Sequence, residues 1–261
     1  MKHCVCLMLC VAACFCCACH KKSGKGHPPV QVEVLNRMTP IKDQGKSQLC
    51  WAYAMLAALE TEHIGRGDSV NLSPAYIEYM LGREPDAPES KRAMGVTCLN
   101  LMKKYGLCAH DAYRTYAPDI EPPRQVFMGG AIYTPQEFAH SVCAPDEYVA
   151  LTSNSDEPYG KEIDIDMPDN WEHNRFLNVP MDTLLRRTVR AVRHHHGICW
   201  ESSGHAMAIV GLACDSTGQR YFIFKNSWGD HDADHGLVYM SFDRFRKETL
   251  AIEMTREAWE H

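Results

Sequence analysis

The sequence predicts an α+β fold in which a helical N-terminal half and a β-rich C-terminal half meet at a cleft. Residues 50–63 are rich in Ala, Leu, Met and Glu and are mostly apolar, which predicts a buried central helix. Short apolar or alternating runs in the second half predict strands at residues 198–200, 205–213, 221–225, 237–241 and 250–255. A cleft between two such halves is a common place for an active site.

The first half contains further local signals. Residues 30–34 alternate in polarity and predict a short strand. Ser73 is a good N-cap and Pro74 suits the first position of a helix, so a helix is expected to begin there. Residues 96–105 predict another helix, which Gly106 ends.

The middle of the chain, residues 113–174, is polar and rich in proline. Its periodicity is weak, and we assign no element there. Residues 180–196 predict a helix that carries several arginines. We interpret these arginines as one solvated helix face.

Composition limits the class of protein. The chain has 261 residues, of which 45% are hydrophobic, enough for one large or two small globular domains with a sizeable core. The net charge of −6 provides no basic field for nucleic acid, so we expect no nucleic-acid partner.

The N-terminus reads as a targeting segment. Residues 1–19 combine a short basic start with an apolar, cysteine-rich run, and residues 20–29 form a polar tether, which leaves residues 30–261 as the folded domain. The run is shorter than the roughly 20 apolar residues of a transmembrane helix. Residues 11–14 resemble a bacterial lipobox, which predicts lipidation of Cys14 and an exported protein anchored to the cell envelope. Ordinary signal cleavage, or processing at Cys17 or Cys19, are the alternatives.

The cysteines beyond the targeting segment are scattered, with no C-x-x-C spacing: Cys50, Cys98, Cys108, Cys143, Cys199 and Cys214. Neither a zinc site nor a disulfide framework is indicated. We therefore expect no metal and no cofactor.

Three polar residues form a candidate catalytic set. Cys50 begins the predicted central helix, where the helix dipole is expected to lower its pKa and favour the nucleophilic thiolate. His205 would take the thiol proton or hold it as an imidazolium–thiolate pair. Asn226 would accept from the other ring nitrogen and fix the tautomer. The order Cys, His, Asn indicates a hydrolase with a cysteine nucleophile.

Two neighbours fit the same scheme. Gln44, six residues before Cys50, could donate to the oxyanion together with the Cys50 backbone N–H. Trp228 would cover Asn226 and keep water from its bond to His205. Taken singly, each of these residues reads as an ordinary core or turn residue; their conjunction in one order favours the catalytic interpretation.

These motifs resemble those of papain-like cysteine peptidases. The resemblance rests on residues 40–54 around Cys50, residues 204–211 around His205, and residues 225–229 and 236–240 around Asn226. Residues 176–182 and 197–200, with the sequence His-Ala-Met from His205, are most similar to the bleomycin hydrolase and aminopeptidase C branch.

The resemblance implies a papain-like two-domain fold and peptide hydrolysis through a thioester acyl-enzyme. It implies catalytic roles for Cys50, His205, Asn226 and Gln44, and it assigns Gly95 to the substrate-binding region, with Trp228 beside it. The expected partner is a peptide or protein substrate, and the branch suggests an aminopeptidase.

The chain departs from its apparent relatives in two ways. Residues 46–49 lack the second cysteine of papain, so the disulfide that anchors that loop is absent. Bleomycin hydrolases carry insertions that build a hexameric cage, whereas residues 201–204 alone separate Trp200 from His205. Two alternatives stay open: a catalytically idle papain-like binding module, and a cysteine-dependent amidase or acyl transferase on the same fold.

Overall fold

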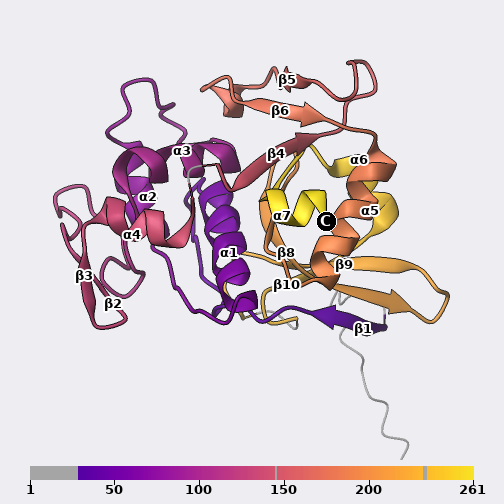
Figure 1. Cartoon of the computed structure of the whole chain (residues 1–261), viewed down its shortest axis with the longest axis horizontal. Helices are drawn as coiled ribbons and strands as arrows, with labels where there is room; N and C mark the ends of the chain where they lie inside the picture. Colours follow the sequence, from indigo (N-terminus) through magenta and orange to yellow (C-terminus); the bar gives the residue numbers. More distant parts are fainter. Residues whose placement is uncertain (1–28, 145, 232–233) are drawn as a thin grey trace, which may run out of the picture.

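The computed structural model describes residues 29–144, 146–231 and 234–261. Figure 1 shows helices α1 to α4 on one side of the molecule and the large sheet, with α5 to α7 against it, on the other. The helical side consists of α1 (Cys50–Gly65), α2 (Pro74–Leu81), α3 (Gly95–Tyr105) and α4 (Pro135–Val142), with the hairpin β2 (Val126–Met128) and β3 (Ala131–Tyr133). The predicted α+β architecture is confirmed.

The large sheet has the strand order β10-β9-β8-β7-β11-β4-β6-β5, and β1 also pairs with β8. Its strands are β1 (Val30–Leu35), β4 (Tyr148–Thr152), β5 (Glu162–Asp164), β6 (Arg175–Asn178), β7 (Ile198–Glu201), β8 (Ala206–Asp215), β9 (Arg220–Lys225), β10 (Leu237–Ser241) and β11 (Ala251–Thr255). All the pairings are antiparallel except that of β4 with β6. Strand β7 pairs with the first half of β8 and β1 with the second half, so both lie along one edge of this long strand.

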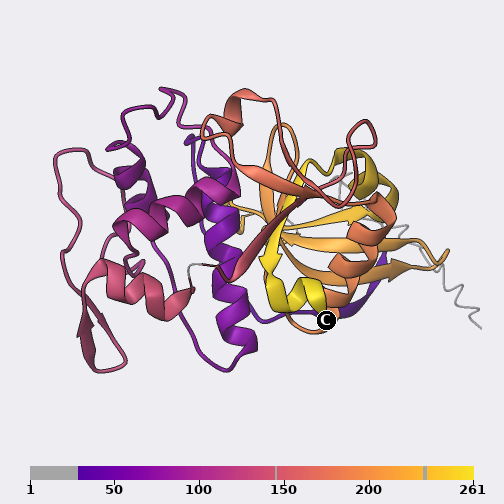
Figure 2. The same ribbon diagram turned by 45° about the horizontal axis from the view of Figure 1, so that its top comes forward.

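The sheet separates two hydrophobic cores because side chains alternate along its strands. On β7, Cys199 faces the core that α1 shares with the other N-terminal helices. Its neighbours Ile198 and Trp200 face the opposite core. That second core is covered by α5 (Met181–Arg193), α6 (Phe242–Glu248) and α7 (Arg256–Glu260). Figure 2 shows α5 and α6 on the side of the sheet away from α1.

Helix α1 packs directly on the sheet at the boundary between the two halves. The buried Gly197 brings the chain entering β7 so close to α1 that a Cβ atom there would lie 1.8 Å from the Ala58 carbonyl oxygen. Since that oxygen belongs to helix backbone, it cannot move aside alone. Glycine at position 197 is therefore a requirement of how α1 is seated.

The local helix signals act as predicted. The Ser73 hydroxyl accepts from the Tyr76 backbone N–H at 3.0 Å and caps α2. Gly106 ends α3 with a φ of 91°.

The unassigned middle segment holds elements that the sequence analysis missed. Helix α4 begins with a capping box of Thr134 and Glu137, a signal that was readable in the sequence. Strand β4 pairs with β11, about 100 residues later, and no local pattern reveals such a partner. Outside this segment, the short helices α6 and α7 near the C-terminus were also not predicted.

The predicted signal segment, the lipidation site Cys14 and nearly all of the tether lie outside the described residues, so these assignments stay predictions. Among the helices of the described ranges, none has the length and apolar character needed to span a bilayer.

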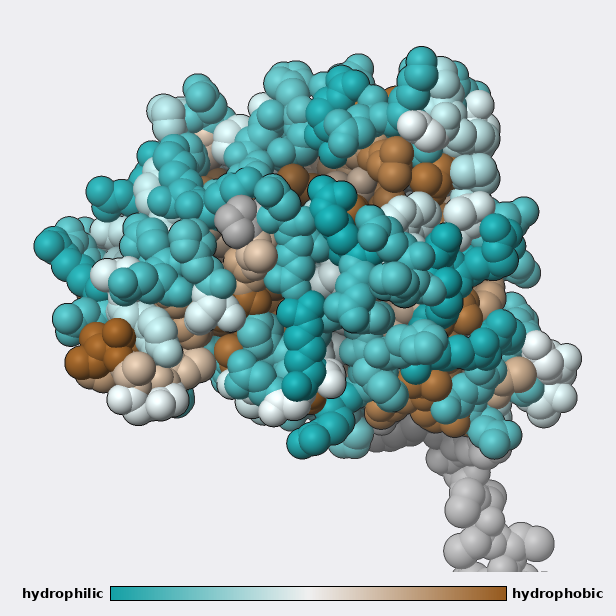
Figure 3. Space-filling view, in the orientation of Figure 1, coloured by the Kyte–Doolittle hydropathy of each residue, from teal (hydrophilic) through white to brown (hydrophobic). Residues whose placement is uncertain are grey.

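Most of the face in Figure 3 is hydrophilic. A hydrophobic patch lies over the β2–β3 hairpin, where the cross-strand partners Phe127 and Ile132 are 70% and 59% exposed. The hairpin lies on the helical side of the molecule, and none of its residues lines the cavity that contains Cys50.

We expect Gly197→Ala to destabilise the fold by at least about 3 kcal/mol, because overpacking against backbone cannot relax. Gly204→Ala is the matched control: a Cβ at Gly204 meets nothing within 4 Å, and the change should stay within about 0.5 kcal/mol. Urea unfolding followed by circular dichroism measures both. Equal stability of the two variants would contradict the close seating of α1.

Candidate active site

Cys50 is the first residue of α1, as predicted. The preceding Leu49 is buried and supplies no side-chain cap to the first turn of the helix. The indole of the buried Trp51 donates to the Lys91 carbonyl at 3.0 Å, which fixes the start of the helix in the core. The thiol thus sits at a helix start that is anchored in the core.

His205 and Asn226 lie at the same end of two adjacent strands. His205 directly precedes β8, and Asn226 directly follows β9. Because β8 and β9 run antiparallel, these positions come together, and His205 Nε2 lies 2.8 Å from Asn226 Oδ1. The same oxygen accepts from the Ser227 backbone N–H at 2.9 Å. Asn226 Oδ1 is therefore an acceptor, His205 Nε2 carries a proton, and Nδ1 is left as the basic nitrogen.

Trp228 stacks on His205, with ring centroids 4.8 Å apart and an interplanar angle of 30°. The indole is itself 62% exposed, so it covers the imidazole from the solvent side. This agrees with a shielding role for Trp228; its assignment to substrate binding stays a prediction.

The predicted nucleophile and base, Cys50 and His205, line one narrow cavity between the two halves. The backbone N–H of Ala206, the residue after the histidine, lies close enough to the Cys50 thiol to lower its pKa. The lining is completed by residues of both halves: Gln48, Trp51, Arg92, Ala93, Asp169, Glu201, Ser202, Gly204 and Ala206.

Burial controls the titration of the pair. Burial raises the pKa of the Cys50 thiol, and the nearby Glu201 carboxyl adds to the rise, while the Ala206 and Trp51 N–H groups and Arg92 oppose it. Burial lowers the pKa of His205, and its bond to Asn226 acts in the opposite direction. Desolvation by burial is the largest of these effects on Cys50, so its thiol pKa is raised although the helix terminus favours the thiolate. The raised thiol pKa differs from the prediction made from the helix dipole.

Gln44 is held against the Asn226 segment. Its Oε1 accepts from the Ser227 hydroxyl at 2.5 Å, its Nε2 donates to the Ser47 carbonyl at 2.7 Å, and its backbone N–H donates to the Ser227 carbonyl at 2.7 Å. One N–H of the amide stays available. Oxyanion donation by Gln44 therefore stays a prediction that this geometry permits.

Gly95 lies behind the cavity. It is buried at the start of α3, and its N–H donates to Glu201 Oε1 at 2.9 Å. The residues of this segment that line the cavity are Arg92 and Ala93, three and two positions earlier. The substrate-binding role predicted for Gly95 thus has no support from the cavity lining.

Sequence analysis also missed an ion pair at the cavity. The Arg92 guanidinium holds the Asp169 carboxylate in a bidentate contact, with Nη2 to Oδ2 at 2.6 Å and Nε to Oδ1 at 2.9 Å. Asp169 comes from the short helix η1 (Pro168–Asn170), inside the segment left unassigned. The two residues are 77 positions apart, so no local pattern could have shown the pair.

A buried ionic cluster connects the two halves beneath the site. Glu60 on α1, which is 0% exposed, pairs with Lys42 and with Lys225, whose Nζ lies 3.7 Å from Glu60 Oε2. Lys225 also donates to the Thr39 hydroxyl at 2.7 Å, and that hydroxyl donates to Glu60. Since Lys225 directly precedes Asn226, the cluster ties the helix of the nucleophile to the strand end that orients the histidine.

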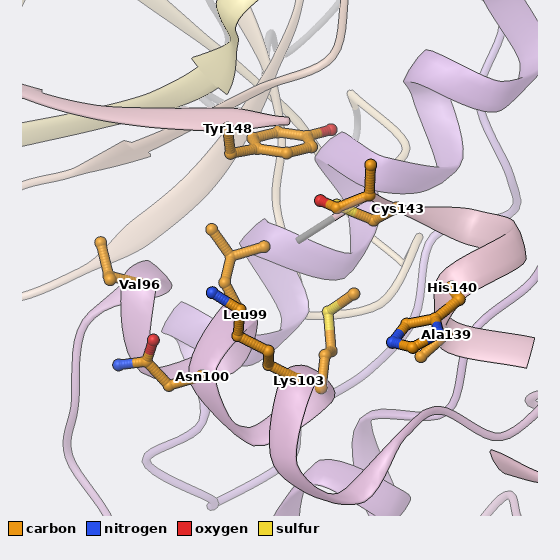
Figure 4. Close-up of a pocket in the computed structure, with 10 residues that line it drawn as sticks. Val96, Leu99, Asn100, Lys103, Ala139, His140, Cys143 and Tyr148 are labelled. Atoms are coloured by element: carbon orange, nitrogen blue, oxygen red, sulfur yellow. The ribbon is translucent and has the colours of Figure 1, made fainter. Parts of the chain in front are cut away.

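A second pocket lies on the helical side, between α3, α4 and the start of β4 (Figure 4). Its lining includes Leu99, Lys103, His140 and Cys143, and the Tyr148 hydroxyl beside it is buried without a hydrogen-bond partner. None of the catalytic candidates lines this pocket, so it is separate from the chemistry at Cys50.

Comparison with known proteins agrees with the geometry. The chain is 25% identical over 219 residues to cathepsin K of Gallus gallus, an alignment that covers 82% of this chain and 58% of the relative. It is 23% identical over 171 residues to aminopeptidase W of Lactobacillus delbrueckii subsp. lactis, covering 48% and 39%. Ananain of Ananas comosus is 23% identical over 214 residues, covering 79% and 53%. The chain spans roughly half the length of the curated relatives it matches.

Solved structures share the fold. PepW from Lactobacillus rhamnosis superimposes with a TM-score of 0.67 at 14% identity, over 87% of this chain and 82% of that chain. The bromelain protease from Ananas comosus, in complex with the E64 inhibitor, gives a TM-score of 0.52 at 16% identity, over 84% and 93%. The family model described as papain family cysteine protease matches residues 29–258. With its cysteine, histidine and asparagine brought together as that fold requires, the chain belongs to the papain family of cysteine proteases.

Proposed function

We propose that this chain hydrolyses peptide bonds with Cys50 as the nucleophile. The observation that carries the proposal is the shared cavity: the thiol at the start of α1 and the Asn226-oriented imidazole of His205 line the same narrow space. A nucleophile, a base beside it and a third group that orients the base are the elements of covalent catalysis by a triad.

The proposed proton transfers run through the free ring nitrogen of His205. Cys50 Sγ attacks the carbonyl carbon of the substrate, and the thiol proton passes to His205 Nδ1. The tetrahedral intermediate collapses to a thioester, and His205 returns the proton to the leaving amine. Water, deprotonated by the same nitrogen, then hydrolyses the thioester and frees the thiol.

Charge on the oxyanion needs donors near Cys50. The Cys50 backbone N–H lies at an uncapped helix start, and the remaining amide N–H of Gln44 is the second candidate. Loss of one such donor typically costs about 2.7–4 kcal/mol of transition-state stabilisation. Gln44 therefore belongs to the proposed catalytic set.

The resting state follows from burial. A raised thiol pKa and a lowered imidazole pKa favour the neutral thiol and neutral histidine over the imidazolium–thiolate pair. His205 then acts as a general base during the attack.

A peptide-library digest read by mass spectrometry tests the activity. We expect wild-type protein to cleave and Cys50→Ala to be inactive, at least about 10³-fold slower, because the nucleophile is lost. Cys214→Ala is the control: Cys214 lies at the far end of β8, so its substitution should leave activity unchanged.

Full cleavage by Cys50→Ala would refute the proposal. No cleavage by wild type, with Cys50 silent to an epoxide thiol probe, would favour an idle binding module. Transfer to an added amine in place of hydrolysis would indicate an acyl transferase.

The pH dependence of kcat/KM should be a broad plateau. The acid limb belongs to His205, which must be neutral to act as a base. Because burial lowers its pKa, activity should persist to a pH below the ordinary imidazole pKa of 6.5. The alkaline limb belongs to Cys50 and should lie above the ordinary thiol pKa of 9.0. Iodoacetamide alkylation of Cys50 against pH supplies a second readout. A thiolate that titrates several units below 9.0 would instead show a preformed ion pair.

We propose an aminopeptidase mode as the finer specificity. It is supported by the similarity to aminopeptidase W. Matched peptides with free and N-acetylated termini provide the test. We expect acetylation to lower kcat/KM at least about tenfold, the loss of one favourable charge contact. Equal rates on both peptides would show endopeptidase cleavage and leave the role of Cys50 intact.

A further inference from the structure

Two acidic residues and a cysteine converge behind the active-site cavity. On β7, Cys199 and Glu201 are two residues apart and so face the same side of the sheet. On β11, Glu253 is the direct cross-strand partner of Cys199. The three side chains therefore project together toward the start of α3. One sulfur and two carboxylate oxygens lie within 4.8 Å of one another, and all three residues are buried.

The carboxylates of this cluster lack compensation. No side chain outside the cluster donates to Glu253, which is 0% exposed: its carboxyl group meets the Cys199 thiol, the Glu201 carboxyl and its own backbone N–H. Among the hydrogen bonds of the described chain, Glu201 Oε1 accepts the Gly95 N–H. No Lys, Arg or His within the described ranges forms an ion pair with either carboxylate. A buried carboxylate without a positive partner costs several kcal/mol.

Glu60 provides an internal comparison. It is equally buried, yet it has two lysines, the Thr39 hydroxyl and the Leu72 N–H as partners. The fold thus compensates one buried carboxylate with fixed cations and leaves the pair beside Cys199 without any. The positive charge for that pair must come from bound protons or from a bound cation.

We propose that Cys199, Glu201 and Glu253 form a binding site for a divalent cation of the zinc class. Thiolate and carboxylate are both zinc ligands, at about 2.3 and 2.0–2.2 Å, which places tetrahedral donors about 3.5 Å apart. The donors must therefore close by at most about 1.3 Å, within the reach of side-chain rotation. Glu201 also lines the cavity at Cys50, which gives the ion a path and a place for a fourth, water ligand.

Gly95 is part of this arrangement. A Cβ atom there would lie 2.9 Å from Glu253 Oε2 and 3.1 Å from Cys199 Sγ. Absence of a side chain at this position leaves the donors free to close on one ion. A glycine is therefore needed at position 95 because of this cluster, and not because the residue lines the cavity.

Protons compete for the same donors. Burial raises the pKa of Glu201 to about 7, although its hydrogen bonds with Glu253 and Gly95 oppose the rise. Burial and the nearby acidic groups raise the pKa values of Glu253 and Cys199 well above their ordinary values. A bound cation must displace these protons. Metal affinity should therefore rise at least tenfold per pH unit between pH 6 and 7.

The test is a Co²⁺ titration of the Cys50→Ala variant, which removes the catalytic thiol as a competing ligand and makes the readout independent of peptidase activity. We expect a thiolate-to-cobalt charge-transfer band that saturates at one equivalent and grows with pH. Adding Cys214→Ser as a matched control should leave the band unchanged. Adding Cys199→Ser should abolish it, and adding Glu253→Gln should weaken binding at least about tenfold.

Circular dichroism verifies that each variant is folded. If Cys199→Ser or Glu253→Gln does not fold, Glu201→Gln is tested in its place. The proposal is overturned if folded Cys50→Ala gives no band at millimolar Co²⁺, which would leave shared protons as the only compensation. A band of unchanged intensity after the Cys199→Ser substitution would also overturn it.

Discussion

The ion cluster around Glu60 is the constraint on which the active site depends. Glu60 lies on α1 ten residues after Cys50, and Lys225 lies on β9 immediately before Asn226. Burial lowers the pKa of Lys225 to about 8, so the lysine depends on its acidic partner to stay charged. Removal of one partner from a buried ion pair typically costs about 3–5 kcal/mol. The relative placement of nucleophile and base is therefore coupled to the stability of the protein.

That coupling fixes the two sides of the site relative to each other. With α1 seated on the sheet at Gly197 and tied to β9 through Glu60, Cys50 and His205 line the same narrow cavity and are both partly buried. Desolvation then favours the neutral forms of both residues. The stacked indole of Trp228 and the second donor from Ser227 keep the Asn226 bond in place, so the basic nitrogen of His205 is defined before a substrate arrives.

The elements that local signals specify were predicted well. The apolar helix at Cys50, the Ser73 cap, the Gly106 stop and the C-terminal strands all lie within a few residues of their expected positions. At these positions the pattern of apolar residues and the capping residues both favour the same helix or strand. The elements between residues 113 and 174 were not predicted, since β4 needs β11 and β6 needs β4 before either is stabilised. The capping box at Thr134 is the exception: the signal was local, and the analysis overlooked it.

By itself, the sequence determined the family and predicted the kind of chemistry: short motifs, by their residue types and order, mark Cys50, His205 and Asn226 as the candidate catalytic residues. Only the tertiary structure decided how those groups titrate and what surrounds them. The Arg92–Asp169 pair, the compensated Glu60 and the uncompensated Glu201–Glu253 pair each join residues from distant segments. Spacing along the chain indicated no metal site, yet β7 and β11 bring Cys199 and Glu253 face to face. The physical reason is that desolvation and charge compensation depend on distance in space, which a linear sequence does not contain.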